Sequence, residues 1–366
     1  MLQHGDAALR LLPHTLASLL LAGCATQSGD KKTGLITNEQ GTATLEVDLN
    51  AEESAMLITV EGDAFLAVDS ITDPSGETVF HWNDWYSLNT YLTAAVWPLD
   101  KDLVLNWPVR AEDAPLTAGT WEVTFAAVND DGVYQMGKRL TARTQTKADD
   151  DWGSGEIKVV IAFAEGIDED PVVVGAVEAA VTRWEEVWAP YGLVPVVRYA
   201  KADIDAGLPY VGDSTDEVDE LSSQTDADEI LMIVGETISA EELYYGVSGN
   251  IPGSLLDTPR SAVAISWLAN TGLDGEFSTS DIRLMGETMA HETSHYMGLF
   301  HPVETSFDVW DAVRDTEDCN YQESCEADLG DNLMYPYPVC NAFSCIPQDA
   351  LTDIQAGILH RYTGTQ

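Results

Sequence analysis

Three histidines and a glutamate near the C-terminal end of the chain have the types and spacing of a metal-dependent hydrolytic site: His291, Glu292, His295 and His301. His291 and His295 are four residues apart, so on a helix both imidazoles project from one face and can share one Zn²⁺ ion. Three neutral imidazoles leave a fourth position for water, whose pKa zinc lowers from about 15.7 to about 7. Glu292 can accept the proton of that water and pass it to a leaving amine. The spacing therefore predicts peptide-bond hydrolysis.

Two other interpretations of this segment carry less weight. A chance grouping would need five specified residues, Gly298 included, within eleven positions, which is roughly a 10⁻⁵ event per sequence. A structural zinc would normally be closed by a fourth protein ligand and would have no use for Glu292.

A helix must present the first two histidines. Ser278 and Asp281 resemble a capping box, and an apolar face follows them, so we expect a helix from there to the motif. Gly298 can adopt a left-handed conformation, which ends the helix and reverses the chain so that His301 supplies the third nitrogen. The apolar face consists of Ile282, Met285 and Met289.

Strands alternate with helices in the region before this helix. We expect a twisted sheet backed by helices, with strands at residues 157–164, 194–200, 230–234 and 262–266. Asp170 and Pro171 suit the cap and first turn of a helix. Its apolar face comprises Val174, Val177, Val181, Trp184 and Trp188. Residues 246–253 are too rich in Gly and Pro for a central strand, so they predict an edge strand or a bulged loop.

The N-terminal half shows the period of two that half-buried strands need. Apolar residues alternate with polar ones around residues 44–49, 56–60 and 121–127, and turn signals at residues 73–76 and 129–132 separate them. We expect a small all-β sandwich over residues 41–143. Residues 115–123 loosely resemble a strand of the pre-peptidase domains of secreted bacterial proteases. Binding substrate, assisting folding or latency, and spacing the catalytic unit all remain open as its role.

Polar segments flank this sandwich. Residues 24–40 predict a flexible tether, and residues 144–155, with three successive aspartates, predict a linker to a domain at residues 156–366.

The first 23 residues have the pattern of an export signal. Residues 1–10 form a leader with one basic side chain, and residues 11–22 are an apolar run too short to span a bilayer. The sequence Leu21-Ala22-Gly23-Cys24 resembles a bacterial lipobox, which implies cleavage before Cys24 and attachment of a lipid to its thiol. We therefore expect an exported protein, anchored by lipid at the outer membrane or cell surface. An ordinary secretory signal with an incidental cysteine is the alternative.

The charge of the chain excludes one class of function. The chain has 17 Lys and Arg against 62 Asp and Glu, a net charge of -45, which repels phosphate backbones and excludes nucleic-acid binding as its main function.

Four cysteines lie close together in an exported chain and imply two disulfides, with three pairings open. They are Cys319, Cys325, Cys340 and Cys345. A zinc site made from them is disfavoured because no Cys-x-x-Cys pair occurs.

The His-Glu-x-x-His-x-x-Gly-x-x-His segment resembles the consensus of the metzincin metallopeptidases, whose second mark is a methionine-containing turn beneath the zinc. Residues 331–336, Asp-Asn-Leu-Met-Tyr-Pro, look like that turn. The resemblance implies that Met334 forms an apolar floor under the histidines. The turn is similar to that of the matrixins, whereas the cysteine-rich loop around it is more like that of the pappalysins. The resemblance therefore does not decide between these two branches of the metzincins. Pro336 stands where astacins and serralysins have a tyrosine ligand.

The resemblance covers about residues 155–366 and implies further features. An edge strand would pair with an extended substrate. Residues 335–338 would wall the pocket for the side chain after the scissile bond. The substrate-binding candidates are thus Gly246, Val247, Ser248, Gly249, Tyr335 and Tyr337.

A closing helix is expected at residues 351–362, with Leu351, Ile354 and Ile358 in the core and with His360 not a ligand. No cysteine between Cys24 and this domain could act as a cysteine switch. The acidic loop at residues 308–331 is a candidate Ca²⁺ site.

Together these features predict an α+β protein that is a secreted, lipid-anchored zinc endopeptidase, acting on protein or peptide substrates and meeting the membrane only through its lipid. A catalytically silent binding or adhesion module and a zinc amidase acting on cell-wall peptides are the alternatives.

Overall fold

A computed structural model describes residues 9–11, 28–86, 89–148, 152–207, 216–239, 244–272, 275–340 and 345–366. The fold is mixed α+β, as expected, with several sheets and helices. Within the described ranges, no helix is both long and apolar enough to cross a membrane.

The chain divides into two compact units that are not continuous in sequence. Unit 1 contains residues 1–24, 154–296 and 330–351. Unit 2 contains residues 25–153, 297–329 and 352–366. The predicted single domain at residues 156–366 differs from this division, because two of its segments belong to unit 2.

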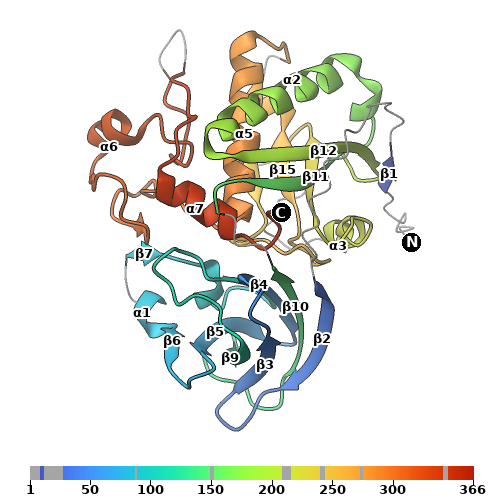
Figure 1. Ribbon diagram of the computed structural model, residues 1–366. Helices are drawn as coiled ribbons and strands as arrows, with labels where there is room; N and C mark the ends of the chain where they lie inside the picture. Colours follow the sequence, from blue (N-terminus) through green and yellow to red (C-terminus); the bar gives the residue numbers. More distant parts are fainter. Residues whose placement is uncertain are drawn as a thin grey trace. The chain divides into compact units, whose positions relative to one another are not determined.

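A six-stranded sheet forms the framework of unit 1 (Figure 1). In spatial order its strands are β1 (Leu9–Leu11), β12 (Leu193–Ala202), β11 (Gly155–Phe163), β13 (Glu229–Gly235), β15 (Val263–Ser266) and β14 (Gly246–Ser248). The four inner strands are parallel, and the two edge strands run antiparallel to them. Parallel strands covered on both faces read as continuous apolar runs, which is why the sequence located β11, β13 and β15. Strand β12 has exposed residues, including Val194 and Val196.

Strand β1 lies within the predicted export signal, where Leu9–Leu11 pairs with β12. Cys24 lies outside the described residues. Cleavage and lipidation therefore stay predictions.

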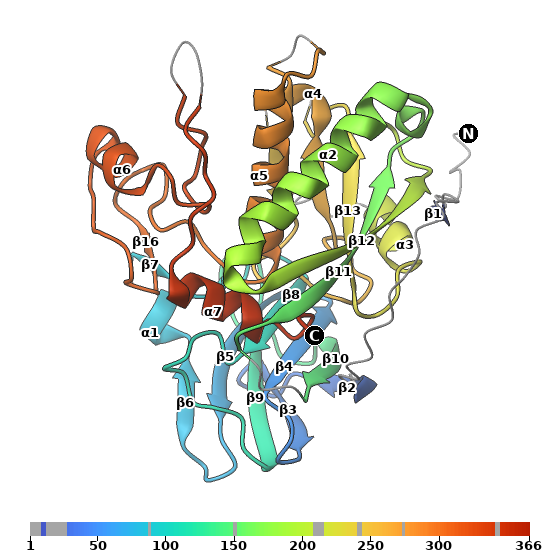
Figure 2. The same ribbon diagram turned by 45° about the horizontal axis from the view of Figure 1, so that its top comes forward.

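Helices α2 (Pro171–Trp188) and α5 (Thr279–Tyr296) pack side by side in unit 1 (Figure 2). The Asp170 carboxylate accepts hydrogen bonds from the N–H groups of Val172 and Val173, which caps α2 as predicted. Gly286 permits the close approach, since a Cβ there would lie 2.5 Å from the carbonyl oxygen of Ala180. Shorter helices are η2 (Ile167–Glu169), η3 (Ala189–Tyr191), α3 (Asp216–Ser222) and α4 (Trp267–Asn270).

The capping box predicted for α5 is confirmed. The Ser278 N–H donates to the Asp281 carboxylate at 2.7 Å, and the Asp281 N–H donates to the Ser278 hydroxyl at 3.3 Å. These two bonds fix where α5 begins.

Unit 2 contains two four-stranded antiparallel sheets (Figure 1). The first is ordered β2 (Ser28–Ile36), β10 (Arg139–Lys147), β4 (Ala55–Gly62), β8 (Asp102–Trp107). The second is ordered β3 (Thr42–Leu49), β9 (Gly119–Val128), β5 (Phe65–Thr72), β6 (Thr78–His81). The alternating residues of β3 and β9 are buried on one face, as their period of two indicates. The short elements α1 (Asn83–Tyr86), β7 (Thr90–Tyr91) and η1 (Ala94–Val96) follow β6.

Two polar segments predicted to be flexible belong to this sheet structure. The predicted tether is wrong over Ser28–Ile36, because this segment pairs with β10 through its main chain, and such pairing needs no apolar side chains. The predicted linker is wrong over Thr144–Lys147, which belongs to β10 and has buried polar side chains. The Thr146 hydroxyl donates to the Glu53 carboxylate at 2.9 Å. The Lys147 ammonium donates to the carbonyl of His360 at 3.1 Å. Residues 149–151 lie outside the described residues.

Segments late in the sequence complete unit 2. Phe300 packs edge-on against Tyr91 and Trp97, and β16 (Trp310–Asp311) pairs with β7. The buried amide of Asn106 donates to the Arg361 carbonyl at 3.0 Å. Helix α6 (Gln322–Leu329) also belongs here. Through these contacts residues 297–329 and 352–366 pack with the N-terminal sheets in unit 2.

The C-terminal helix forms close to its predicted position, as α7 (Asp353–Arg361) with a capping box at Thr352. Leu351 and Ile358 are buried as expected. The prediction for Ile354 is wrong, since its side chain is 43% exposed on the outer face of the helix's first turn. His360 is buried.

The four clustered cysteines form two disulfides, Cys319–Cys325 and Cys340–Cys345. Each bridge joins two cysteines that follow one another among the four, at separations of 6 and 5 residues. No disulfide therefore links the Cys319–Cys325 pair to the Cys340–Cys345 pair.

Candidate metal centre

The three predicted ligands come together at the end of α5. His291 and His295 lie one turn apart with ring centroids 4.6 Å from each other. Helix α5 ends at Tyr296, and Gly298 then takes φ of 112°, in the left-handed region that favours glycine. One nitrogen from each of His291, His295 and His301 lies within 4.8 Å of the others. The described residues contain no other group of this kind.

Hydrogen bonds orient two of the three rings. His291 Nδ1 lies 2.6 Å from the carbonyl oxygen of Leu333, which can only accept, so this nitrogen carries the proton. His301 Nδ1 lies 3.0 Å from the Glu304 carboxylate and is placed to donate in the same way. Nδ1 is thus the protonated nitrogen of both rings, and Nε2 is the atom that would ligate a metal, the usual arrangement for metal-binding histidines. The donor set fits zinc.

The turn predicted at residues 331–336 lies beside His291. The Tyr335 N–H donates to the Asn332 carbonyl at 3.0 Å, and the Met334 N–H donates to the Asn332 side chain at 2.8 Å. Met334 is fully buried. The turn thus places the Leu333 carbonyl where His291 needs an acceptor.

Glu292 is held against the edge strand of the sheet. Its side chain is buried, and the Ser248 N–H donates to its carboxyl group. Burial raises the pKa of Glu292 to about 8, and the bond from Ser248 opposes this rise. Gly246 approaches so closely that a Cβ there would lie 2.5 Å from Glu292 Cγ.

A cavity of about 250 Å³ opens beside His291 and Glu292. This volume suits one amino-acid side chain rather than a larger ligand. Its other lining residues are Tyr244, Tyr245, Gly246, Leu284, Glu287, Thr288, Leu333, Tyr335, Pro336, Tyr337, Pro338 and Gln348.

The predicted substrate-binding residues separate into two groups. Gly246, Tyr335 and Tyr337 line the cavity, and the two tyrosine hydroxyls lie 3.0 Å apart. The other three do not line it. Val247 is buried in the sheet, Ser248 bonds Glu292, and Gly249 packs against the Arg260 carbonyl.

Several cavity residues were not predicted. Leu284, Glu287 and Thr288 precede His291 by seven, four and three residues, so the helical period alone could have placed them on its face. Gln348 has no comparable signal because it comes from a distant loop.

Replacing Gly246 by alanine is expected to lower the rate of hydrolysis at least about tenfold with zinc retained, because the new methyl group must displace Glu292. Peptide-cleavage rates and zinc content would be measured together. Gly175→Ala is the matched control, since nothing lies within 4 Å of a Cβ there. Equal activity in the two variants would contradict a fixed position for Glu292.

The acidic loop at residues 308–331, the candidate Ca²⁺ site, has fewer converging ligand groups than the histidine centre. Asp311 and Asp315 line a cavity of about 700 Å³ in unit 2, but among the described acidic residues of the loop no three come together as a ligand group. Calcium binding stays a prediction.

Asp311 is nevertheless expected to make stability depend on pH. Its Oδ2 atom is buried without a hydrogen-bond partner in the described structure, and burial, aided by the Asp315 and Glu304 carboxylates, raises its pKa to about 7. The Val313 and Arg314 N–H groups oppose this rise. Between about pH 4 and about pH 7 only the unfolded chain releases this proton, so rising pH favours unfolding by up to about 1.4 kcal/mol per pH unit.

The substitution Asp311→Asn should remove this contribution. Urea unfolding at about pH 5.5 and about pH 8, with EDTA to exclude bound cations, would compare it with the wild type. We expect the variant to lose less stability between the two pH values. Parallel losses in both proteins would refute the assignment.

Comparison with known proteins identifies no close relative. No protein-family model matches the chain, and no curated protein does. Among solved structures, metalloproteinase-II from Bacteroides fragilis matches with a TM-score of 0.32 and 10% identity, over 65% of each chain. The propeptide form of Bacillus licheniformis lipase BlEst2 matches with a TM-score of 0.20 and 14% identity, over 46% of this chain and 27% of the lipase. At these scores neither likeness establishes a shared fold or activity.

Proposed function

We propose that the protein is a zinc-dependent endopeptidase. The observation that carries the proposal is the grouping of three imidazoles with a buried glutamate that shares a side-chain-sized cavity with the first of them. A structural metal site would not need Glu292 held beside such a cavity.

The residues support distinct roles in hydrolysis. His291, His295 and His301 would hold the ion, which when bound polarises the substrate carbonyl and acidifies water. Glu292 takes a proton from the attacking water and delivers it to the departing amine. Strand β14 occupies a sheet edge, where an extended substrate could add by main-chain hydrogen bonds. The cavity would receive the side chain after the scissile bond.

The finer assignments rest on the sequence. The spacing of the motif and the turn around Met334 support membership of the metzincins, in a branch similar to the pappalysins or matrixins. The leader and Cys24 support export and a lipid anchor at the cell envelope.

Digestion of casein by the full chain carrying Cys24→Ser would test the proposal, with chelation and zinc restoration in parallel. We expect cleavage that the chelator abolishes and zinc restores. Cleavage of muropeptides but not of casein would select the amidase alternative. Zinc binding with no cleavage of either substrate would select the binding module.

A further inference from the structure

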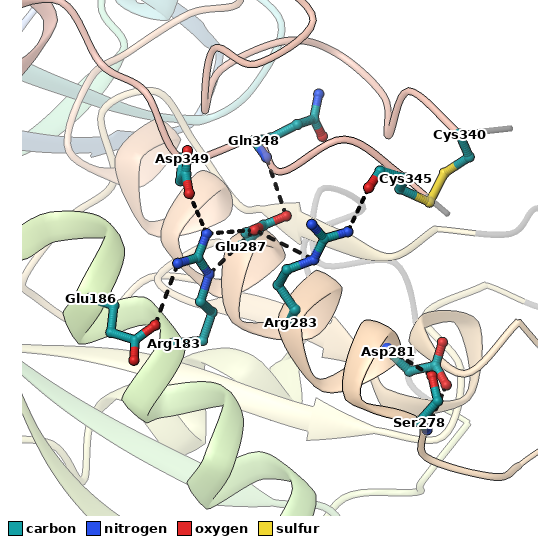
Figure 3. Close-up of polar contacts among 10 residues, drawn as sticks. All are labelled: Arg183, Glu186, Ser278, Asp281, Arg283, Glu287, Cys340, Cys345, Gln348 and Asp349. Carbon is teal, nitrogen blue, oxygen red and sulfur yellow. Dashed lines mark hydrogen bonds and ion pairs between the residues drawn. A yellow bond between two sulfur atoms is a disulfide. The ribbon is translucent and has the colours of Figure 1, made fainter. Parts of the chain in front are cut away.

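A group of charged side chains, of which only Glu287 is buried, connects α2, α5 and a late loop of unit 1 (Figure 3). Arg183 of α2 donates to Glu287 of α5 through Nη2 at 2.8 Å and through Nε at 3.3 Å. The same Nη2 donates to Asp349 at 2.5 Å. We call Arg183, Glu287 and Asp349 the arginine clamp. It joins two helices to the segment that follows the Cys340–Cys345 disulfide.

The clamp joins two walls of the cavity. Glu287 lies on α5 one turn before His291, and Gln348 precedes Asp349 in the loop; both line the cavity. The Gln348 N–H donates to Glu287 at 3.3 Å, and the Gln348 side-chain amide donates to the Tyr337 carbonyl at 3.0 Å. Fixing residues 348–349 against Glu287 therefore also fixes the wall that contains Tyr337.

The clamp also connects to the first metal ligand. Asp349 is followed by Ala350, whose carbonyl accepts from the Leu333 N–H at 2.7 Å and whose own N–H donates to the Asp331 carbonyl at 3.1 Å. The Leu333 carbonyl is the acceptor for His291 Nδ1. A continuous series of bonds thus runs from Arg183 through the loop to His291.

Stability alone is a weak reason for such a cluster. Solvent screens the partly exposed pair with Asp349, and desolvation of the buried Glu287 carboxylate opposes its attraction to Arg183, so neither pair stabilises the fold strongly. The geometry of the clamp is specific, however, since the planar guanidinium bonds two carboxylates from separate segments at fixed angles. Arg283 of α5 makes a second tie to the same loop, donating to the Cys345 carbonyl at 2.7 Å.

We propose that Arg183 is a positioning residue for the peptidase, which sets the shape of the pocket for the side chain after the scissile bond and steadies His291. This rests on the proposed function. Loss of the clamp lets the loop wall move away from α5, so a side chain in the pocket loses contacts while the scissile bond remains accessible.

The test compares peptides that differ only in the residue after the scissile bond. The ratio of kcat/KM between the preferred residue and alanine is measured for the wild type and for Arg183→Met. We expect the ratio to fall about tenfold. Partial unfolding would scale the rates of all peptides equally, so this ratio is insensitive to a purely structural role.

Three further variants sharpen the comparison. Asp349→Asn removes the loop anchor from a side chain that is 40% exposed, so it leaves no buried charge unpaired, and it should lower the ratio in the same direction. Arg183→Lys keeps the charge without the planar fork and should be intermediate. Arg198→Met breaks the Arg198–Glu229 pair of unit 1, which does not line the cavity, and should leave the ratio unchanged.

Zinc affinity gives a readout that needs no turnover. Competition with a chromophoric chelator should show about tenfold weaker binding in Arg183→Met, as expected when a partner that orients a ligand is displaced. An unchanged ratio together with unchanged zinc affinity would overturn the proposal. A wild type that binds zinc but cleaves no peptide would instead refute the proposed function, and the zinc comparison would still test the clamp.

Discussion

Replacing Glu292 by glutamine is expected to reduce hydrolysis by about 10²–10⁴-fold while zinc remains bound at full stoichiometry. The amide keeps the volume of the side chain and an oxygen for the Ser248 N–H, so the cavity and the edge strand should not change. It cannot accept a proton from water. The loss should therefore appear in kcat, with little change in KM.

Glu292→Ala should lose as much activity as Glu292→Gln. Both variants lack the carboxylate that accepts the proton, and the volume of the side chain does not matter for that step. Zinc content by elemental analysis and peptide cleavage would be followed on the same preparations. Glu165→Ala is a suitable control, since that glutamate is exposed and is not among the cavity-lining residues. A glutamine variant that kept more than about a tenth of the wild-type rate would show that another group moves the proton.

The parts of this site that could be predicted from the sequence are those set by local chemistry. The capping box at Ser278 and Asp281 fixes the start of α5, and Gly298 determines its end. The positions of His291 and His295 follow from the helical period between those two points. Strands β11, β13 and β15 were predictable for a similar reason, since a continuous apolar run needs no distant partner to be recognised.

The parts that could not be predicted depend on residues far apart in sequence. Nothing near Thr144–Lys147 indicates that a buried lysine will find the carbonyl of His360, so the segment resembled a linker. The acceptor for His291 is a carbonyl in a turn, and carbonyls carry no signature of residue type. The partner of Glu287 could not be predicted either, because only the folded chain brings Arg183 of α2 to it.

The Ile354 error has a related cause. Helical spacing identifies which residues share a face, but the face that is covered depends on what packs against it. Here Ile358 faces the interior while Ile354, one turn earlier, lies where the helix starts and is left largely uncovered.

Replacing His295 by alanine is expected to remove the metal itself. His295 is the most buried of the three ligands, and its ring meets that of His291 at a centroid distance of 4.6 Å. Substituting a residue that only orients a ligand typically weakens metal binding by about 10–100-fold, so loss of a ligand should weaken it by more than about 100-fold. Hydrolysis should disappear with the ion.

Loss of zinc from His295→Ala must be distinguished from the destabilisation that follows removal of any buried imidazole. His360→Ala removes another buried imidazole, in a helix of unit 2, and should retain zinc in full. Both variants would be checked by circular dichroism and then titrated with zinc against a chromophoric chelator. If His295→Ala kept full zinc occupancy, the ion would have to be held elsewhere. Substitutions at Glu292 and at His295 should therefore differ. Glu292 variants should keep zinc without turnover, whereas His295 variants should lose both, because the proposed function makes Glu292 the base and His295 a metal ligand.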